Sequence, residues 1–414
     1  MIKFESQTLA NGLQVLVHED KSTNIAVINV AYKVGSRDEK EDRTGFAHLF
    51  EHLMFGGSLN IPSYDEPLQN AGGENNAYTT PDLTNYYLTL PANNIETGFW
   101  LESDRMLSLS FEPRVLEVQR KVVIEEFNQR YINQPYGDVW HKMRDMAYKV
   151  HPYRWPTIGL NMSHIETATM DLVKAFFKKY YVPNNAVLVI AGNIESSKAF
   201  ALAEKWFGPI PKGDEIIRSI AEEPKQQDKR TLETFEQVPA NAYYKAFHMP
   251  ARTAEKYYTT DLLSDVLGRG KSSRLNQRLV EEDKTFSDIS AYVTGSLDPG
   301  LLVISGKLTD GTDFSEAEKG VTKIIEAILN TEPTAKELEK VKNQAISSLV
   351  FGEVQLLNRA MNLAYFALLG NANKINCEEE ELMAIETKDI LKQAQEILTE
   401  NNSSTLYYHA NSKK

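Results

Sequence analysis

The feature that most constrains the fold is an order of strand-like and helical segments that occurs twice along the 414 residues. In each half, a strand-like segment is followed by an apolar pattern of helical period and then by a long helical pattern. These segments are residues 25–34, 44–55 and 113–131 in the first half, and residues 242–249, 256–266 and 337–349 in the second. The repetition predicts a divergent internal duplication.

A polar segment separates the two halves. Residues 211–230 are charged and interrupted by proline, which is typical of a linker. The sequence therefore predicts an N-terminal domain (1–210), a linker (211–230) and a C-terminal domain (231–414). Because the strands and long helices do not alternate as regular βαβ units, we expect an α+β fold.

The composition excludes several classes of protein. The chain has 45 Lys and Arg against 57 Asp and Glu, and this net charge of −12 argues against a general nucleic-acid binder. A single cysteine, Cys377, cannot form an internal disulfide or a cysteine-based zinc finger. The sequence shows no signal-peptide pattern and no apolar run of about 18 residues, so it predicts a cytoplasmic protein without a membrane span.

The sharpest motif is HLFEH at residues 48–52. His48 and His52 are one helical turn apart, so both imidazoles can reach a single metal ion at ~2.0–2.1 Å. Glu51 stands beside His52, where it can take a proton from a metal-bound water. This pattern is the inverted form of HExxH, the inverzincin motif. The alternative is a helix with two surface histidines, which the apolar neighbours disfavour because histidines inside such a helix need partners.

A third protein ligand must come from another element, because two histidines do not hold a zinc ion alone. The long helix at 113–131 offers Glu125 and Glu126 after the apolar residues Val122 and Val123. The spacing does not choose between the two glutamates, and without the histidine motif they would be read as a solvated acidic face.

Together these residues resemble the pitrilysin and mitochondrial-processing-peptidase family. The likeness covers nearly the whole chain and includes GGENNAYTTPDLTNYYLTLP (72–91), HPYRWPTIG (151–159), YYVPNNAVLVIAGNI (180–194) and SSRLNQRLVEE (272–282). It implies two homologous halves, each an antiparallel-rich sheet packed with long helices, with the metal site in the first half only. It also implies one Zn²⁺ per chain, held by His48, His52 and Glu126, with Glu51 as the general base.

Two positions depart from the family pattern. Gln119 stands where the family usually has a glutamate that supports the metal ligands, so zinc affinity or water acidity is expected to differ. In the second half, Arg274 fits the start of the family's Arg/Tyr pattern, but Ser287 takes the tyrosine position and Tyr292 is a poor substitute. The resemblance therefore implies a heterodimer with a homologous subunit that supplies the Arg/Tyr pair. A homodimer, or a single-chain enzyme that uses Tyr292, is the alternative.

Substrate contact is expected at Asn76 and Ala77, because this segment lines an edge strand beside the metal in the family. An extended peptide can add to such an edge through main-chain hydrogen bonds. A purely structural turn is the alternative for these residues. The sequence thus predicts a zinc endopeptidase that acts on unstructured peptides or processing segments. The competing interpretation is a non-catalytic structural or peptide-binding member of the same fold.

Overall fold

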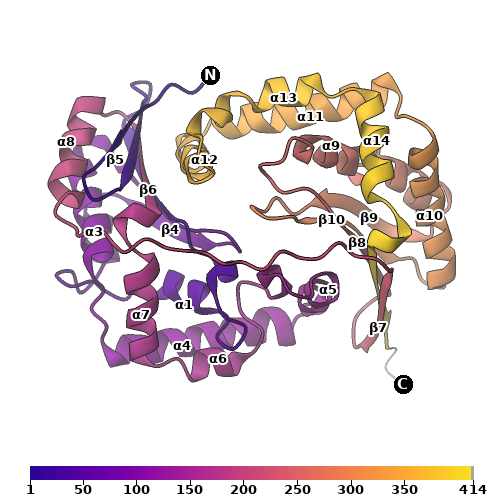
Figure 1. Cartoon of the computed structure of the whole chain (residues 1–414), viewed down its shortest axis with the longest axis horizontal. Helices are drawn as coiled ribbons and strands as arrows, with labels where there is room; N and C mark the ends of the chain where they lie inside the picture. Colours follow the sequence, from indigo (N-terminus) through magenta and orange to yellow (C-terminus); the bar gives the residue numbers. More distant parts are fainter. Residues whose placement is uncertain (412–414) are drawn as a thin grey trace. The chain divides into compact units, whose positions relative to one another are not determined.

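The computed structural model describes residues 1–411, which form two compact units (Figure 1). The first unit comprises Met1–Gln129, Trp155–Ala221 and Val350–Cys377. The second comprises Arg130–Arg154, Glu222–Leu349 and the described residues from Glu378 onward. Each unit thus contains a segment that lies in the other half of the sequence.

The first unit is built on a six-stranded sheet with the order β1-β2-β6-β3-β5-β4. Only β2 and β6 pair in parallel among these strands, and the other neighbours are antiparallel. The strands are β1 (Glu5–Thr8), β2 (Gln14–Glu19), β3 (Ile25–Tyr32), β4 (Glu74–Thr79), β5 (Thr84–Pro91) and β6 (Ala186–Gly192). Strand β4 forms one edge of this sheet.

Helices cover both faces of the first sheet. The helices of this unit are α1 (Phe46–Leu53), α2 (Asp65–Asn70), α3 (Ile95–Leu107), α4 (Pro113–Phe127), α6 (Met162–Glu166), α7 (Met170–Tyr180), α8 (Ser196–Phe207) and α12 (Leu356–Leu368). Helix α12 packs on β6 and β3, where Leu363 meets Val27 and Val189 in one apolar cluster. Helices α3 and α8 pack against β3, β5 and β2. A helix from the far end of the sequence therefore completes the core of the first unit.

The second unit contains a five-stranded sheet with the order β7-β11-β8-β10-β9. Its strands are β7 (Arg230–Glu236), β8 (Ala242–His248), β9 (Phe286–Val293), β10 (Leu301–Leu308) and β11 (Ser403–Ala410). Its helices are α5 (Val139–Ala147), α9 (Tyr257–Gly268), α10 (Phe314–Asn330), α11 (Ala335–Glu353, which continues into the first unit), α13 (Glu378–Ala384) and α14 (Thr387–Ile397). Helix α5 packs on one face, against Ala242 and Ala246. Tyr243 and Phe247, which alternate with them, face the larger cluster on the other side.

The two sheets have the same topology. If β2 to β6 are matched in chain order with β7 to β11, the spatial order and the direction of every pair coincide, including the single parallel pair. Helix α1 follows β3 as α9 follows β8. The predicted α+β fold with two homologous halves is therefore confirmed.

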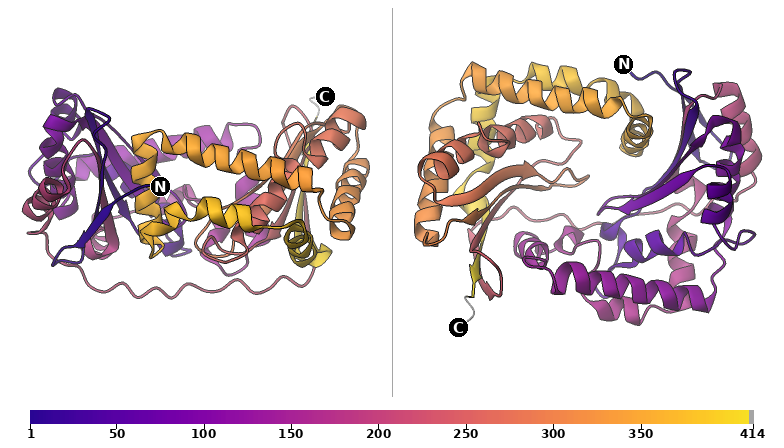
Figure 2. Two further views of the ribbon diagram at one scale, coloured as in Figure 1. Left: turned by 90° about the horizontal axis from the view of Figure 1, so that it is seen from above. Right: turned by 180° about the vertical axis from the view of Figure 1, so that it is seen from behind.

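The predicted linker carries no helix or strand between residues 211 and 228, and Figure 2 shows it as an extended segment. The predicted domains, 1–210 and 231–414, are continuous stretches of the sequence. The compact units are not continuous: residues 130–154 belong to the second unit, and residues 350–377 belong to the first. In the described part of the chain, the search for a helix long and apolar enough to cross a membrane found none.

Candidate metal and catalytic site

Helix α1 presents its polar residues on one face and anchors the other in the core. Leu49 and Phe50 are fully buried, whereas His48, Glu51 and His52 are partly exposed. The imidazole rings of His48 and His52 lie 4.9 Å apart between centroids and nearly perpendicular. The i and i+4 spacing thus places both rings on the same side of the helix, as predicted.

Helix α4 packs against α1 and brings a carboxylate to the two rings. Glu126 Oε2 lies 3.5 Å from Nε2 of His48 and 3.5 Å from Nε2 of His52. Within residues 1–411, these three residues form the single cluster of His, Cys, Asp or Glu side chains whose ligand atoms all lie within 4.8 Å of one another. Glu125 is exposed and accepts a hydrogen bond from Gln129 at 3.0 Å, so of the two candidate glutamates it is Glu126 that lies with the histidines.

The donor set of this cluster fits a zinc ion. Two imidazole nitrogens and one carboxylate oxygen from two helices are the ligand types that catalytic zinc sites use, with a further position left for water or substrate. The three side chains are each at most a quarter exposed, so the cluster is largely shielded from solvent.

Glu51 is tied to the edge strand of the sheet. Thr79, the last residue of β4, donates a hydrogen bond from Oγ1 to Glu51 Oε2 at 2.6 Å. This contact fixes one carboxylate oxygen beside the histidine face of α1. Strand β4 also carries Asn76 and Ala77, which pair with Tyr87 and Tyr86 of β5 on one side only. The predicted substrate residues therefore lie on an edge strand next to α1.

A buried cation lies behind α1. Arg105 and Glu102, both on α3, form an ion pair with Arg105 Nε 2.9 Å from Glu102 Oε2, and their side chains are 1% and 0% exposed. The guanidinium lies over the rings of Tyr64 and Tyr86 at 4.5 Å from each centroid. Tyr86 in turn donates to Phe50 O of α1 at 3.3 Å. The sequence interpretation missed this support, although opposite charges at i and i+3 on a helix are a signal for an ion pair.

A second missed residue is Glu39, which precedes α1 in the chain. Its carboxylate accepts hydrogen bonds from the backbone N–H groups of Gly45 at 2.9 Å and Ala47 at 2.8 Å. Burial raises the pKa of Glu39 to about 8, and the two backbone hydrogen bonds oppose that rise. No local sequence signal marked this acid, because it is six residues away from the first of its partners.

The remaining predicted residues lie on α4 and in the second unit. Gln119 lies half-buried on α4, seven residues and thus about two turns before Glu126. Arg274, in the second unit, donates two hydrogen bonds to Glu337, at 2.9 and 3.2 Å. Ser287 donates to Lys307 O at 3.2 Å from an exposed position on β9. Tyr292, on the same strand, packs its ring against Trp140 with centroids 6.4 Å apart.

Comparison with known families identifies the class of protein. Residues 14–158 match the model described as "Insulinase (Peptidase family M16)", and residues 167–345 match the model described as "Peptidase M16 inactive domain". Together the two models cover well over half of the chain. The chain belongs to peptidase family M16.

Individual relatives agree with this assignment. The "Zinc protease PqqE" of Helicobacter pylori is 28% identical over 98% of this chain and 92% of its own length. An "Uncharacterized zinc protease YmxG" of Bacillus subtilis is 26% identical over 96% of this chain and 97% of its own length. Among solved structures, a protease from Helicobacter pylori superposes with a TM-score of 0.93 at 28% identity, over 99% of this chain and 100% of the other. Pitrilysin shares the fold, with a TM-score of 0.78 at 18% identity over 100% of this chain and 45% of its own.

Proposed function

We propose that this protein is a zinc-dependent endopeptidase that hydrolyses unstructured peptides or processing segments. The observation that carries the proposal is the convergence of His48, His52 and Glu126, with Glu51 beside them and held by Thr79. These residues are the ligands and the general base of the proposed site. The names of the relatives as zinc proteases support the same class of reaction.

Each residue then has a defined role. A zinc ion at the three ligands would acidify a bound water and polarise the peptide carbonyl. Glu51 accepts the proton of the attacking water and passes it to the leaving amine nitrogen. Thr79 donates a hydrogen bond to one oxygen of Glu51 and is proposed to orient this carboxylate for the proton transfer. Gln119, on the same face of α4 as Glu126, is proposed to support that ligand without adding a charge.

The edge strand β4 is the proposed platform for the substrate. Its outer side has no neighbouring strand within the described sheet, so an extended peptide can pair with it at Asn76 and Ala77. Main-chain pairing tolerates many sequences but requires an extended chain. This requirement favours unfolded peptides over folded proteins.

A homologous partner subunit is proposed to supply the Arg/Tyr pair, whose side chains would contact the carbonyl oxygen of the substrate. The Arg274 guanidinium donates two hydrogen bonds to Glu337, and the position expected for a tyrosine is Ser287. This chain matches only 48% of the periplasmic protease PqqL of Escherichia coli and 45% of pitrilysin, so those chains contain a further half of similar length. A heterodimer with a homologous subunit would supply an equivalent half, and a homodimer is the alternative.

Hydrolysis of an internally quenched peptide mixture at saturating zinc tests the proposal. Wild-type cleavage that is lost in Glu51→Gln while bound zinc is retained would support a peptidase. Glu126→Gln should lose zinc as well as cleavage, whereas Glu125→Gln, its exposed neighbour, should lose neither.

Two other results would point elsewhere. Robust cleavage by the isolated chain would contradict the need for a partner. The second result is a folded, zinc-loaded protein that binds peptides without cleaving them, both alone and after homologous subunits are added. This result would contradict the proposed reaction and favour a non-catalytic, peptide-binding member of the fold.

A further inference from the structure

The metal-binding helix α1 has no cap of its own. Its N-cap position is Gly45, which has a left-handed backbone (φ 88°) and no side chain to accept the first helical N–H groups. A Cβ at this position would lie 2.7 Å from Ile158 O, so a capping side chain such as serine does not fit there. The N–H groups at the start of an α-helix nevertheless need acceptors.

Glu39 provides those acceptors from outside the helix. One carboxylate oxygen accepts from Gly45 N–H and the other from Ala47 N–H, and the residue is 8% exposed. A single buried side chain therefore holds the first turn of the helix whose next residues are His48 and Glu51.

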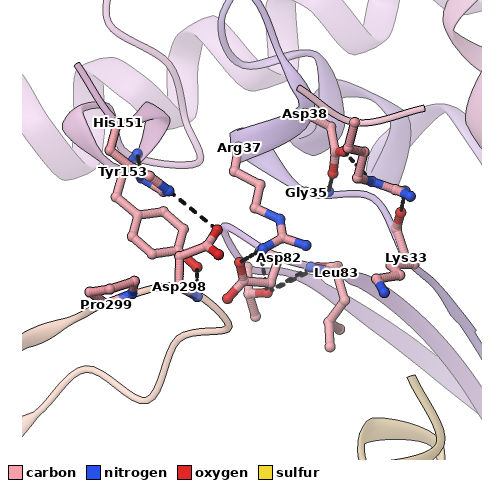
Figure 3. Close-up of polar contacts among 12 residues, drawn as sticks. Lys33, Gly35, Arg37, Asp38, Asp82, Leu83, His151, Tyr153, Asp298 and Pro299 are labelled. Carbon is pink, nitrogen blue, oxygen red and sulfur yellow. Dashed lines mark hydrogen bonds and ion pairs between the residues drawn. The ribbon is translucent and has the colours of Figure 1, made fainter. Parts of the chain in front are cut away.

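The loop that carries Glu39 is itself fixed to the segment that follows the edge strand β4. Ser36 N–H donates to Thr80 O at 3.3 Å, and Arg37 N–H donates to Pro81 O at 2.9 Å. The Arg37 guanidinium forms an ion pair with Asp82 at 3.3 Å, with both side chains buried (Figure 3). Residues 35–39, most of which are buried, thus connect helix α1 with the segment after strand β4.

We propose that Glu39 is a positioning residue of the metal site. Its carboxylate caps α1 and holds that helix in register with β4, so that His48 and His52 keep their metal-binding geometry and Glu51 keeps its distance from Thr79. The importance of Glu39 for catalysis rests on the proposed function. Its effects on zinc affinity and on the stability of α1 can be measured without any peptide cleavage.

The test compares Glu39→Ala with Glu41→Ala, a matched control that removes an exposed carboxylate from the same loop. The zinc dissociation constant is measured by competition with a chromogenic chelator, at a temperature where all variants are folded. We expect Glu39→Ala to raise this constant about tenfold, on the scale seen when groups that orient metal ligands are removed. The control should leave it unchanged.

Hydrogen exchange of α1 gives a second reading on the metal-free protein. Loss of a helix cap costs about 1 kcal/mol, so amides at the start of α1 should exchange about fivefold faster in Glu39→Ala and at the wild-type rate in Glu41→Ala. If Glu39→Ala does not fold, Glu39→Gln, which keeps the volume and one acceptor oxygen, takes its place in both measurements.

The results separate this inference from the proposed function. A lower melting temperature with an unchanged zinc dissociation constant and unchanged exchange of α1 would make Glu39 an ordinary structural residue and overturn the inference. If the wild type bound no zinc, the proposed function would fail. Exchange at the start of α1 would then still decide whether Glu39 holds the helix.

Discussion

The buried ion pair between Glu102 and Arg105 leads to a quantitative prediction. Glu102→Gln removes the charge that compensates Arg105, while the shape of the side chain is kept. Both side chains are essentially inaccessible, at 0% and 1% exposure, so the guanidinium would remain in the core without a counter-charge. Breaking a buried pair in this way typically costs about 3–5 kcal/mol. Because the amide still accepts one hydrogen bond and the rings of Tyr64 and Tyr86 still face the cation, we expect about 3 kcal/mol.

The same helix provides a matched control. Glu96, also on α3, pairs with Lys205 at 2.6 Å, but the two side chains are 49% and 60% exposed. Surface pairs contribute about 0–1 kcal/mol, so Glu96→Gln should change the free energy of unfolding by no more than that. The two substitutions therefore have the same chemistry and differ in burial.

Urea unfolding followed by tryptophan fluorescence measures both variants. Three of the four tryptophans, Trp100, Trp155 and Trp206, belong to the first unit, so the signal reports mainly on the unit that contains the pair. A shift of the midpoint with an unchanged slope gives the change in stability. If Glu102→Gln lost less than about 1 kcal/mol, as little as the control, the reasoning that burial makes this pair indispensable would be refuted.

Two further predictions concern Glu39 and Thr79. Because burial raises the pKa of Glu39 from 4.5 to about 8, the folded state binds its proton more tightly, and the free energy of unfolding should fall as the pH rises through this range. Between pH 5 and pH 8.5 the wild type should lose about 4 kcal/mol more than Glu39→Gln in urea titrations, and equal losses would contradict the assignment. Thr79→Val removes the hydrogen bond to Glu51 and should lower kcat at least about tenfold in the peptide assay, with recovery in Thr79→Ser. Similar kcat values for both Thr79 variants would argue against a role for the hydroxyl.

The sequence was sufficient wherever a local pattern determines the geometry. The i and i+4 spacing of His48 and His52 predicts a common face, and both rings lie on it. The choice between Glu125 and Glu126 was beyond local reasoning, because the apolar residues Val122 and Val123 left the phase of the helix open. In the structure Val123 is buried and Val122 is 43% exposed, and this phase turns Glu126 inward.

Features that depend on distant parts of the chain were not visible in the sequence. The periodicity of α12 shows a helix but not that it packs on β3 and β6, more than 150 residues away. The acids Glu39 and Glu102 look like ordinary charged residues until the fold supplies their partners. Contacts between distant segments determine the position of α12 and the partners of these acids, and local sequence patterns do not predict such contacts.

The duplicated topology finally predicts how many zinc ions the chain binds. Helix α9 occupies the place of α1 in the second unit and carries Asp261 and Asp265 at the same i and i+4 spacing, on either side of the fully buried pair Leu262 and Leu263. Arg269 balances the negative charge of Asp265, because its Nη1 lies 2.9 Å from Asp265 Oδ2.

Burial, and the nearby Asp265 carboxylate after it, raise the pKa of Asp261 to about 6. Burial raises the pKa of Asp265 as well, and this carboxylate already has Arg269 as its counter-charge, so the pair is a poor substitute for the two histidines of α1 as a metal site. Zinc titration of the metal-free protein should therefore saturate at one equivalent per chain, and His48→Ala combined with His52→Ala should abolish it. A second equivalent that survives this double substitution and disappears in Asp265→Asn would contradict the argument, because it would show that the duplicated helix also holds a metal.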